Sequence, residues 1–228
     1  MANYIPSASL FLGIIPALIL LFIGVNKYEK IVKHKNIFLT FIVGIIIGFI
    51  AAILEIYTGN VPFYLIVLFP IFEELFKTII LNIGRLHEKP ETVVYGLTLG
   101  LGMGAAATSV SIIQGTIQVG DYLGLGLVVI GSCGIIMLQG ATGVLIGFGV
   151  YKGKLFQYVT LAIVLHIIFF AGLFVVQLSS NITMTIITYL FIAGLIIYWY
   201  ATMKIMPKLL IDSQRRKRTQ KEIEVKNT

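Results

Sequence analysis

Seven long apolar stretches, separated by short polar breaks, follow one another along the sequence. A bilayer core needs about 20 mostly apolar residues per helix, and each stretch reaches that length. They cover residues 5–25, 37–57, 62–83, 93–114, 123–150, 156–178 and 183–203. The breaks carry turn residues or charges: KYEKIVKHKN, TGNVP, GRLHEKPE, QVGDY, YKGK and SSN. The pattern predicts an all-α, polytopic membrane domain of about seven transmembrane helices at residues 1–203, and a basic cytoplasmic tail at residues 204–228.

Lysine and arginine predict the orientation of these helices, because basic loops stay on the cytoplasmic side of a membrane. The first and fifth breaks contain lysines, the third break and the tail contain both residue types, and the second, fourth and sixth breaks contain neither. Sixteen of the 17 basic residues therefore sort to one face, and only Lys77 lies inside a stretch. We expect a protein of the plasma membrane with its N-terminus outside the cell and its C-terminus in the cytoplasm.

The composition excludes a soluble domain, since 58% of the residues are hydrophobic and only 12% are charged, against about 25% charged in soluble chains. The net charge of +7 belongs to one membrane face, so it does not indicate nucleic acid as a partner. The RRKR run at 215–218 favours contact with anionic lipid. The single cysteine, Cys133, implies no disulfide framework, and no cofactor is indicated.

The third stretch carries three charged residues, Glu73, Glu74 and Lys77, near mid-membrane. Each costs roughly 2.5–3.5 kcal/mol at the centre of an isolated helix, so such groups face the protein interior, pair, or lose their charge. Lys77 is one turn from both glutamates, but adjacent side chains point about 100° apart. One carboxylate therefore needs another partner or a proton. Pro70, one turn upstream, leaves a backbone carbonyl without its donor. The alternative interpretation is a Glu–Lys pair that only stabilises helix packing.

His166 lies midway along the sixth stretch, at a depth similar to that of the two glutamates. A single membrane histidine is often only a hydrogen-bonded packing residue. A carboxylate and an imidazole that meet in a low-dielectric interior are, however, the parts of a general-base pair. Gln139 and Thr142 of the fifth stretch are expected to complete this polar cluster. A metal site is poorly supported, because catalytic zinc usually takes three protein ligands.

The fourth stretch contains a glycine stripe, Gly96, Gly100 and Gly104, with one glycine every four residues. Small residues at this spacing let a neighbouring helix backbone approach closely. The neighbour can be a helix of the same chain, or the helix of a substrate or partner.

The order of these motifs resembles the PrsW family, within the superfamily of CAAX-prenyl-endopeptidase-like intramembrane proteases. The resemblance covers roughly residues 10–175 and rests on IIPALILLF, AAILE, EELFK, YGLTLGLG, LQGATG and LHIIFFAG. It implies that Glu73 and Glu74, followed by Lys77, activate water with help from His166.

The chain departs from the pattern of that superfamily in two places, one in the fourth stretch and one in the fifth. Ala107 and Thr108 stand where an acidic residue or a histidine is expected, and Gln139 stands where another histidine is expected. The chain also resembles the anterior-pharynx-defective subunit of γ-secretase, in which a similar arrangement of spans and glycines serves as a scaffold.

Three functions are compatible with these residues. The first is a glutamate-dependent intramembrane peptidase with a partly eroded site, whose substrate is a transmembrane protein. The second is a non-catalytic scaffold that binds the helix of a membrane partner. The third is a proton-coupled transporter, against which stands the absence of an internal repeat across an odd number of spans.

Overall fold

The computed structural model describes residues 6–58, 64–114, 122–176 and 182–210, and these residues form helices and no strand. The α-helices are α1 (Pro6–Val25), α2 (His34–Thr58), α3 (Phe69–Leu81), α4 (Glu91–Gln114), α5 (Tyr122–Lys152), α6 (Leu155–Val176) and α7 (Ile182–Tyr200). Short 3₁₀ segments are η1 (Asn26–Tyr28) and η3 (Gly84–Leu86). Short π-helical segments are η2 (Tyr64–Leu68) and η4 (Ala201–Ile205).

Six helices of the described part are long and apolar enough to cross a membrane. Their spans are Ser9–Tyr28, His34–Tyr57, Glu91–Ile113, Gly126–Lys152, Leu155–Gly172 and Met184–Leu210. The predicted all-helical, multi-pass membrane protein is confirmed at this level.

The remaining helix, α3, is not among these six spans. It has 13 residues and follows directly on the π-helical η2. Pro70 lies at this junction. Proline has no backbone N–H to donate, and its ring clashes with the carbonyl group one turn earlier in a regular α-helix. The π-helical turn widens the backbone where a regular helix would clash, and such turns are frequent at functional sites.

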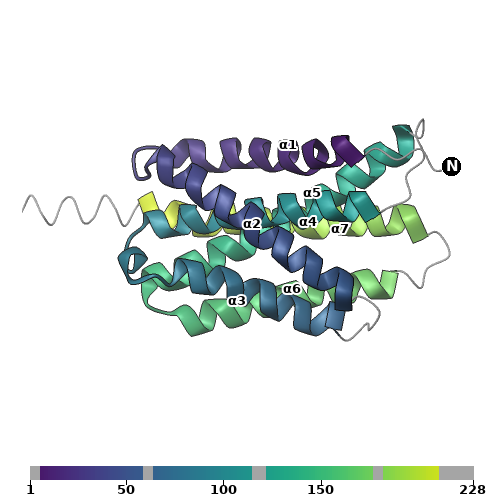
Figure 1. Ribbon diagram of the computed structural model, residues 1–228. Helices are drawn as coiled ribbons and strands as arrows, with labels where there is room; N and C mark the ends of the chain where they lie inside the picture. The colour runs from purple at the N-terminus through teal and green to yellow at the C-terminus, as the bar shows by residue number, and fades with distance from the viewer. Residues whose placement is uncertain (1–5, 59–63, 115–121, 177–181, 211–228) are drawn as a thin grey trace, which may run out of the picture.

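Helices α4 and α5 form the centre of the bundle, as Figure 1 shows. Helices α1 and α2 pack on α4, while α6 and α7 pack on α5, and α3 lies beside α6. Most residues in the α4 and α5 spans are buried, whereas most in the outer spans are not. The outer helices turn large apolar side chains away from the protein, among them Phe22, Phe38 and Ile79. Lipid is the solvent that suits this surface.

The glycine stripe of α4 faces α5 within the same chain. A Cβ added at Gly96 would meet the Gly143 carbonyl oxygen, and one added at Gly100 would meet the Gln139 carbonyl oxygen. At Gly104 the nearest atom would be the Ile136 Cα, at 2.7 Å. The two backbones therefore touch along the stripe, so the neighbour at this surface is a helix of the same chain.

Replacing Gly100 with alanine is expected to destabilise the protein by about 1–3 kcal/mol, because the added methyl group forces α4 and α5 apart. The matched control is Gly126→Ala, because no heavy atom lies within 4 Å of a Cβ at Gly126. Alanine is the better helix former by about 0.8–1.0 kcal/mol, so the control should keep or gain stability. Thermal unfolding in detergent measures both. Leu99, the neighbour of Gly100, is itself fully buried and is no neutral comparison.

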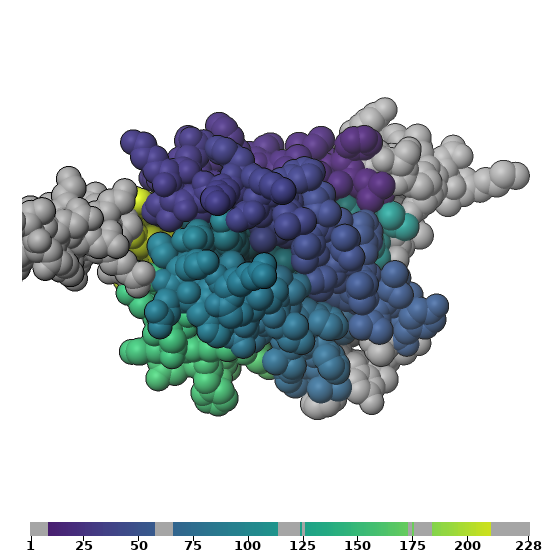
Figure 2. All heavy atoms as spheres, turned by 60° about the vertical axis from the view of Figure 1, so that its left-hand side comes forward, coloured from purple at the N-terminus to yellow at the C-terminus, as the bar shows by residue number. Residues whose placement is uncertain are grey.

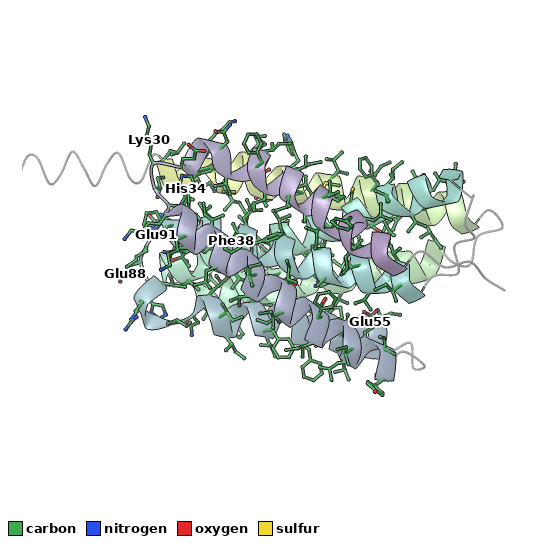
Figure 3. All side chains as sticks on the ribbon, turned by 45° about the horizontal axis from the view of Figure 1, so that its top comes forward. Lys30, His34, Phe38, Glu55, Glu88 and Glu91 are labelled. Carbon is green, nitrogen blue, oxygen red and sulfur yellow. The ribbon has the colours of Figure 1, made fainter. Side chains whose placement is uncertain are left out.

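The described basic residues outside α3 gather at one end of the bundle. Successive helices run in opposite directions, so the α1–α2, α3–α4 and α5–α6 connections and the end of α7 share this end (Figure 1). Figure 3 places Lys30, His34, Glu88 and Glu91 there, and Glu55 at the opposite end.

Packing continues past residue 203, where the tail was expected to begin. Ile205, Met206 and Leu209 belong to the main hydrophobic core. Residues 211–228, which include the RRKR run expected to contact lipid, lie outside the described residues, as do most of the TGNVP, QVGDY and SSN breaks.

Candidate functional site

Helix α3 presents its charged residues to the interior of the bundle and its apolar residues to the outside. Glu74 and Lys77 are fully buried, and Glu73 is nearly so. Phe72, Leu75 and Ile79 of the same helix are exposed. The three charged residues lie on one face of the helix and point into the bundle, while the apolar residues of the opposite face point outward.

Lys77 neutralises Glu74 and ties α3 to α5. Its Nζ donates to Glu74 Oε1 at 2.8 Å and to Thr142 Oγ1 at 2.6 Å. Because both charges are fully buried, their mutual attraction and these hydrogen bonds must offset a desolvation cost of several kcal/mol per ion. Lys77 therefore keeps the Glu74 carboxylate ionised inside the membrane domain.

His166 of α6 joins both glutamates. Its Nδ1 lies 2.6 Å from Glu74 Oε1, and its Nε2 lies 3.4 Å from Glu73 Oε2. An ionised carboxylate only accepts hydrogen bonds, so Nδ1 carries a proton and donates it to Glu74. In the neutral imidazole, Nε2 then holds a lone pair that faces Glu73. The proximity expected from the similar depths of these residues is present in the structure.

Gln139 and Thr142 of α5 complete the cluster, as expected from the sequence. Gln139 Nε2 donates to Glu73 Oε2 at 2.9 Å, and Thr142 Oγ1 donates to the Gln139 carbonyl at 3.2 Å. The two residues are three positions apart and share one face of α5. Glu73 thus accepts from an amide, whereas Glu74 has both a cation and an imidazole as partners. The two glutamates are chemically unequal.

Several buried polar atoms of the cluster have no hydrogen-bond partner among the described residues. They are Glu74 Oε2, Gln139 Oε1 and His166 Nε2. A buried polar group without a partner costs about 1–3 kcal/mol. With His166 protonated on Nδ1, these three atoms are all acceptors. The cluster therefore offers hydrogen-bond acceptors to a group that brings donors, such as water or a peptide N–H.

Two glycines of the stripe lie beside this cluster. Gly100 and Gly104 of α4 both approach Gln139. Thr108 is buried, and Ala107 is only partly so. In the part of the chain that the structure describes, no group of three His, Cys, Asp or Glu residues could hold a metal ion.

The sequence interpretation gave no role to Glu55, which lies near the far end of α2. This carboxyl group is partly buried and within electrostatic range of Glu73. The sequence did indicate that Glu55 faces inward, because it follows the small residues Ala51 and Ala52 at helical spacing, and both of these are buried.

A scan against protein-family models returned no match, and searches of curated proteins and of solved structures returned none either. The fold and the cluster together define a multi-pass helical membrane protein with a buried carboxylate–histidine–lysine site.

Proposed function

We propose that this protein is a PrsW-like, glutamate-dependent intramembrane peptidase. The observation that carries the proposal is the contact of one imidazole with two unequal carboxylates, His166 with Glu74 at 2.6 Å and with Glu73 at 3.4 Å. A packing role needs only the Glu74–Lys77 pair. The second carboxylate and the free imidazole nitrogen are what a general base requires.

The roles of the four central residues follow from their contacts. Glu73, which pairs with no lysine or arginine among the described residues, is the general base. His166 Nε2 faces Glu73 and orients the attacking water. Glu74 is a positioning residue that fixes the tautomer of His166, as the buried carboxylate does in serine-protease triads. Lys77 keeps Glu74 charged.

In the proposed reaction, Glu73 removes a proton from water while the water oxygen forms a bond to the carbonyl carbon of the substrate peptide. The C–N bond then breaks, and the leaving nitrogen takes the proton from Glu73. The products are a carboxylic acid and an amine, and Glu73 returns to its ionised form. The substrate is a transmembrane segment, because the cluster is buried within helices that face lipid.

The glycine stripe gives the scaffold hypothesis no separate support, because α5 packs against it from within the chain. A scaffold would have to bind its partner through the outer helices. The transporter hypothesis gains no observation beyond the buried acids that it shares with a peptidase.

The experiment compares the termini of membrane proteins in cells that carry the wild-type chain or its Glu73→Gln variant. A peptidase produces new N-termini within apolar segments, and these disappear in the variant at equal protein abundance. Identical sets of termini in the two strains would contradict the proposal.

We also propose a seven-span topology in the plasma membrane, with α3 as the third span, the N-terminus outside and the C-terminus in the cytoplasm. The gathering of the described basic loops at one end supports it. In a Cys133→Ser background, an impermeant thiol reagent added to intact cells should label Tyr57→Cys, whose side chain is exposed. Lys30→Cys, Glu88→Cys and Gly153→Cys should react only after lysis. Labelling of Lys30→Cys in intact cells would contradict this topology and indicate the opposite orientation.

A further inference from the structure

The inward face of α2 ends in a carboxylate, Glu55, that the proposed reaction does not use. Gly44, Gly48, Ala51 and Ala52 are buried along this face, the glycines against α4. Glu55 continues the same ridge, whereas Ile53, Leu54, Ile56 and Tyr57 around it are exposed. A charged side chain within a membrane span normally faces the interior for a functional reason. No described residue donates a hydrogen bond to Glu55 or forms an ion pair with it.

Glu55 lies on the side of the molecule where α2 packs beside α3. Helices α2 and α3 lie side by side on one face of the molecule (Figure 2). Glu55 is within electrostatic range of Glu73 and is the more exposed of the two. Glu73 itself faces His166 Nε2, a fully buried atom without a hydrogen-bond partner among the described residues. Glu55, Glu73 and His166 thus form a polar series from the bundle end into its centre.

The series begins at the end opposite the basic loops, where Figure 3 places Glu55. The π-helical η2 contacts both α2 and α6 beside it. At the other end of the cluster, Lys77 and Thr142 are fully buried and bonded to each other. A water molecule that approached from the basic end would therefore meet the buried Lys77–Glu74 ion pair. One that approached from the Glu55 end would meet the carboxylates of Glu55 and Glu73.

We propose that Glu55 is the entry residue of a hydrated route, by which water and protons reach Glu73 and His166 from the bundle end opposite the basic loops. The purpose of the route rests on the proposed peptidase function, since hydrolysis consumes one water per peptide bond. The route itself is a property of the site, so its test measures access and not cleavage.

The test uses the full chain in sealed vesicles, with Cys133→Ser and a reporter thiol at Glu73→Cys. The probes are two impermeant methanethiosulfonates of similar size, one carrying a quaternary ammonium group and one a sulfonate. Tyr57→Cys and Lys30→Cys show which bundle end each vesicle face exposes. In the reporter, Lys77 balances Glu74, so Glu55 is the uncompensated charge on the route.

The ammonium reagent should modify the reporter from the Tyr57 face about tenfold faster than the sulfonate reagent, since a carboxylate concentrates cations. Glu55→Gln should bring the two rates to near equality. Ile56→Gln, which places the same amide on the exposed side of α2, should leave the preference unchanged. If Glu73→Cys does not fold, Gln139→Cys in a Glu73→Gln background is the second reporter, because Gln139 is hydrogen-bonded to Glu73 and Glu55 again remains the uncompensated charge.

Three results would overturn the inference: modification only from the Lys30 face, no modification of either reporter in the folded protein, or an ammonium preference that persists in Glu55→Gln. Loss of peptide cleavage with the route intact would contradict only the proposed function.

Discussion

Replacing Lys77 with methionine is expected to destabilise the protein by about 3–5 kcal/mol, the usual cost when one partner of a buried ion pair is removed. Methionine matches the length of the lysine chain but leaves Glu74 fully buried without a cation. It also removes the hydrogen bond to Thr142, which joins α3 to α5. The measurement is the midpoint of thermal unfolding in detergent, which should fall by roughly 10 °C.

Two further variants separate charge from packing. Lys35→Met removes an exposed lysine at the start of α2 and should shift the midpoint little. The double variant Glu74→Gln with Lys77→Met removes both charges and should recover more than half of the lost stability, because no uncompensated ion remains. A double variant as unstable as Lys77→Met alone would show that the lost hydrogen bonds, and not the buried charge, dominate.

Glu73→Gln is expected to lower peptide hydrolysis by about 10²–10⁴-fold, the usual contribution of a general base, while the fold is preserved. The carboxamide keeps the size of the side chain, and its oxygen can still accept from Gln139. Glu74→Gln is expected to differ. It deprives Lys77 of its counter-ion and His166 of its carboxylate, so both thermal stability and turnover should fall.

The measurement is cleavage of a transmembrane peptide by the reconstituted protein, with unfolding midpoints determined in parallel. Glu88→Gln, which changes an exposed carboxylate in the α3–α4 connection, is the control. Wild-type turnover in Glu73→Gln would exclude Glu73 as the base. Equal losses of stability in the two variants would show that the glutamates are not distinct in role.

The sequence predicted the part of the fold that depends on apolar length and on charge. Long apolar runs set the helices, and lysine alternation agrees with the gathering of basic loops at one end. The convergence of Glu74 and His166 followed from their similar depth and from the cost of burying charge. In each case the prediction used only the depth of a residue in the membrane, which follows from its distance along the sequence from the end of the span.

The contacts between helices could not be predicted in the same way. Helices α4 and α5 are apolar on every side, so periodicity does not show which face meets which neighbour. Leu99, beside the glycine stripe, is fully buried, and a Cβ added at Gly44 of α2 would meet its carbonyl oxygen.

The backbone contact between α4 and α5 restricts how the protein can move. Where Gly96 and Gly143 face each other, no side chain lies between the helices to change rotamer and absorb a shear. The pair must therefore travel as one rigid body. Helix α3 contacts α5 instead through the hydrogen bonds of Lys77 and Glu73. The central pair is therefore the fixed frame against which the outer helices can shift.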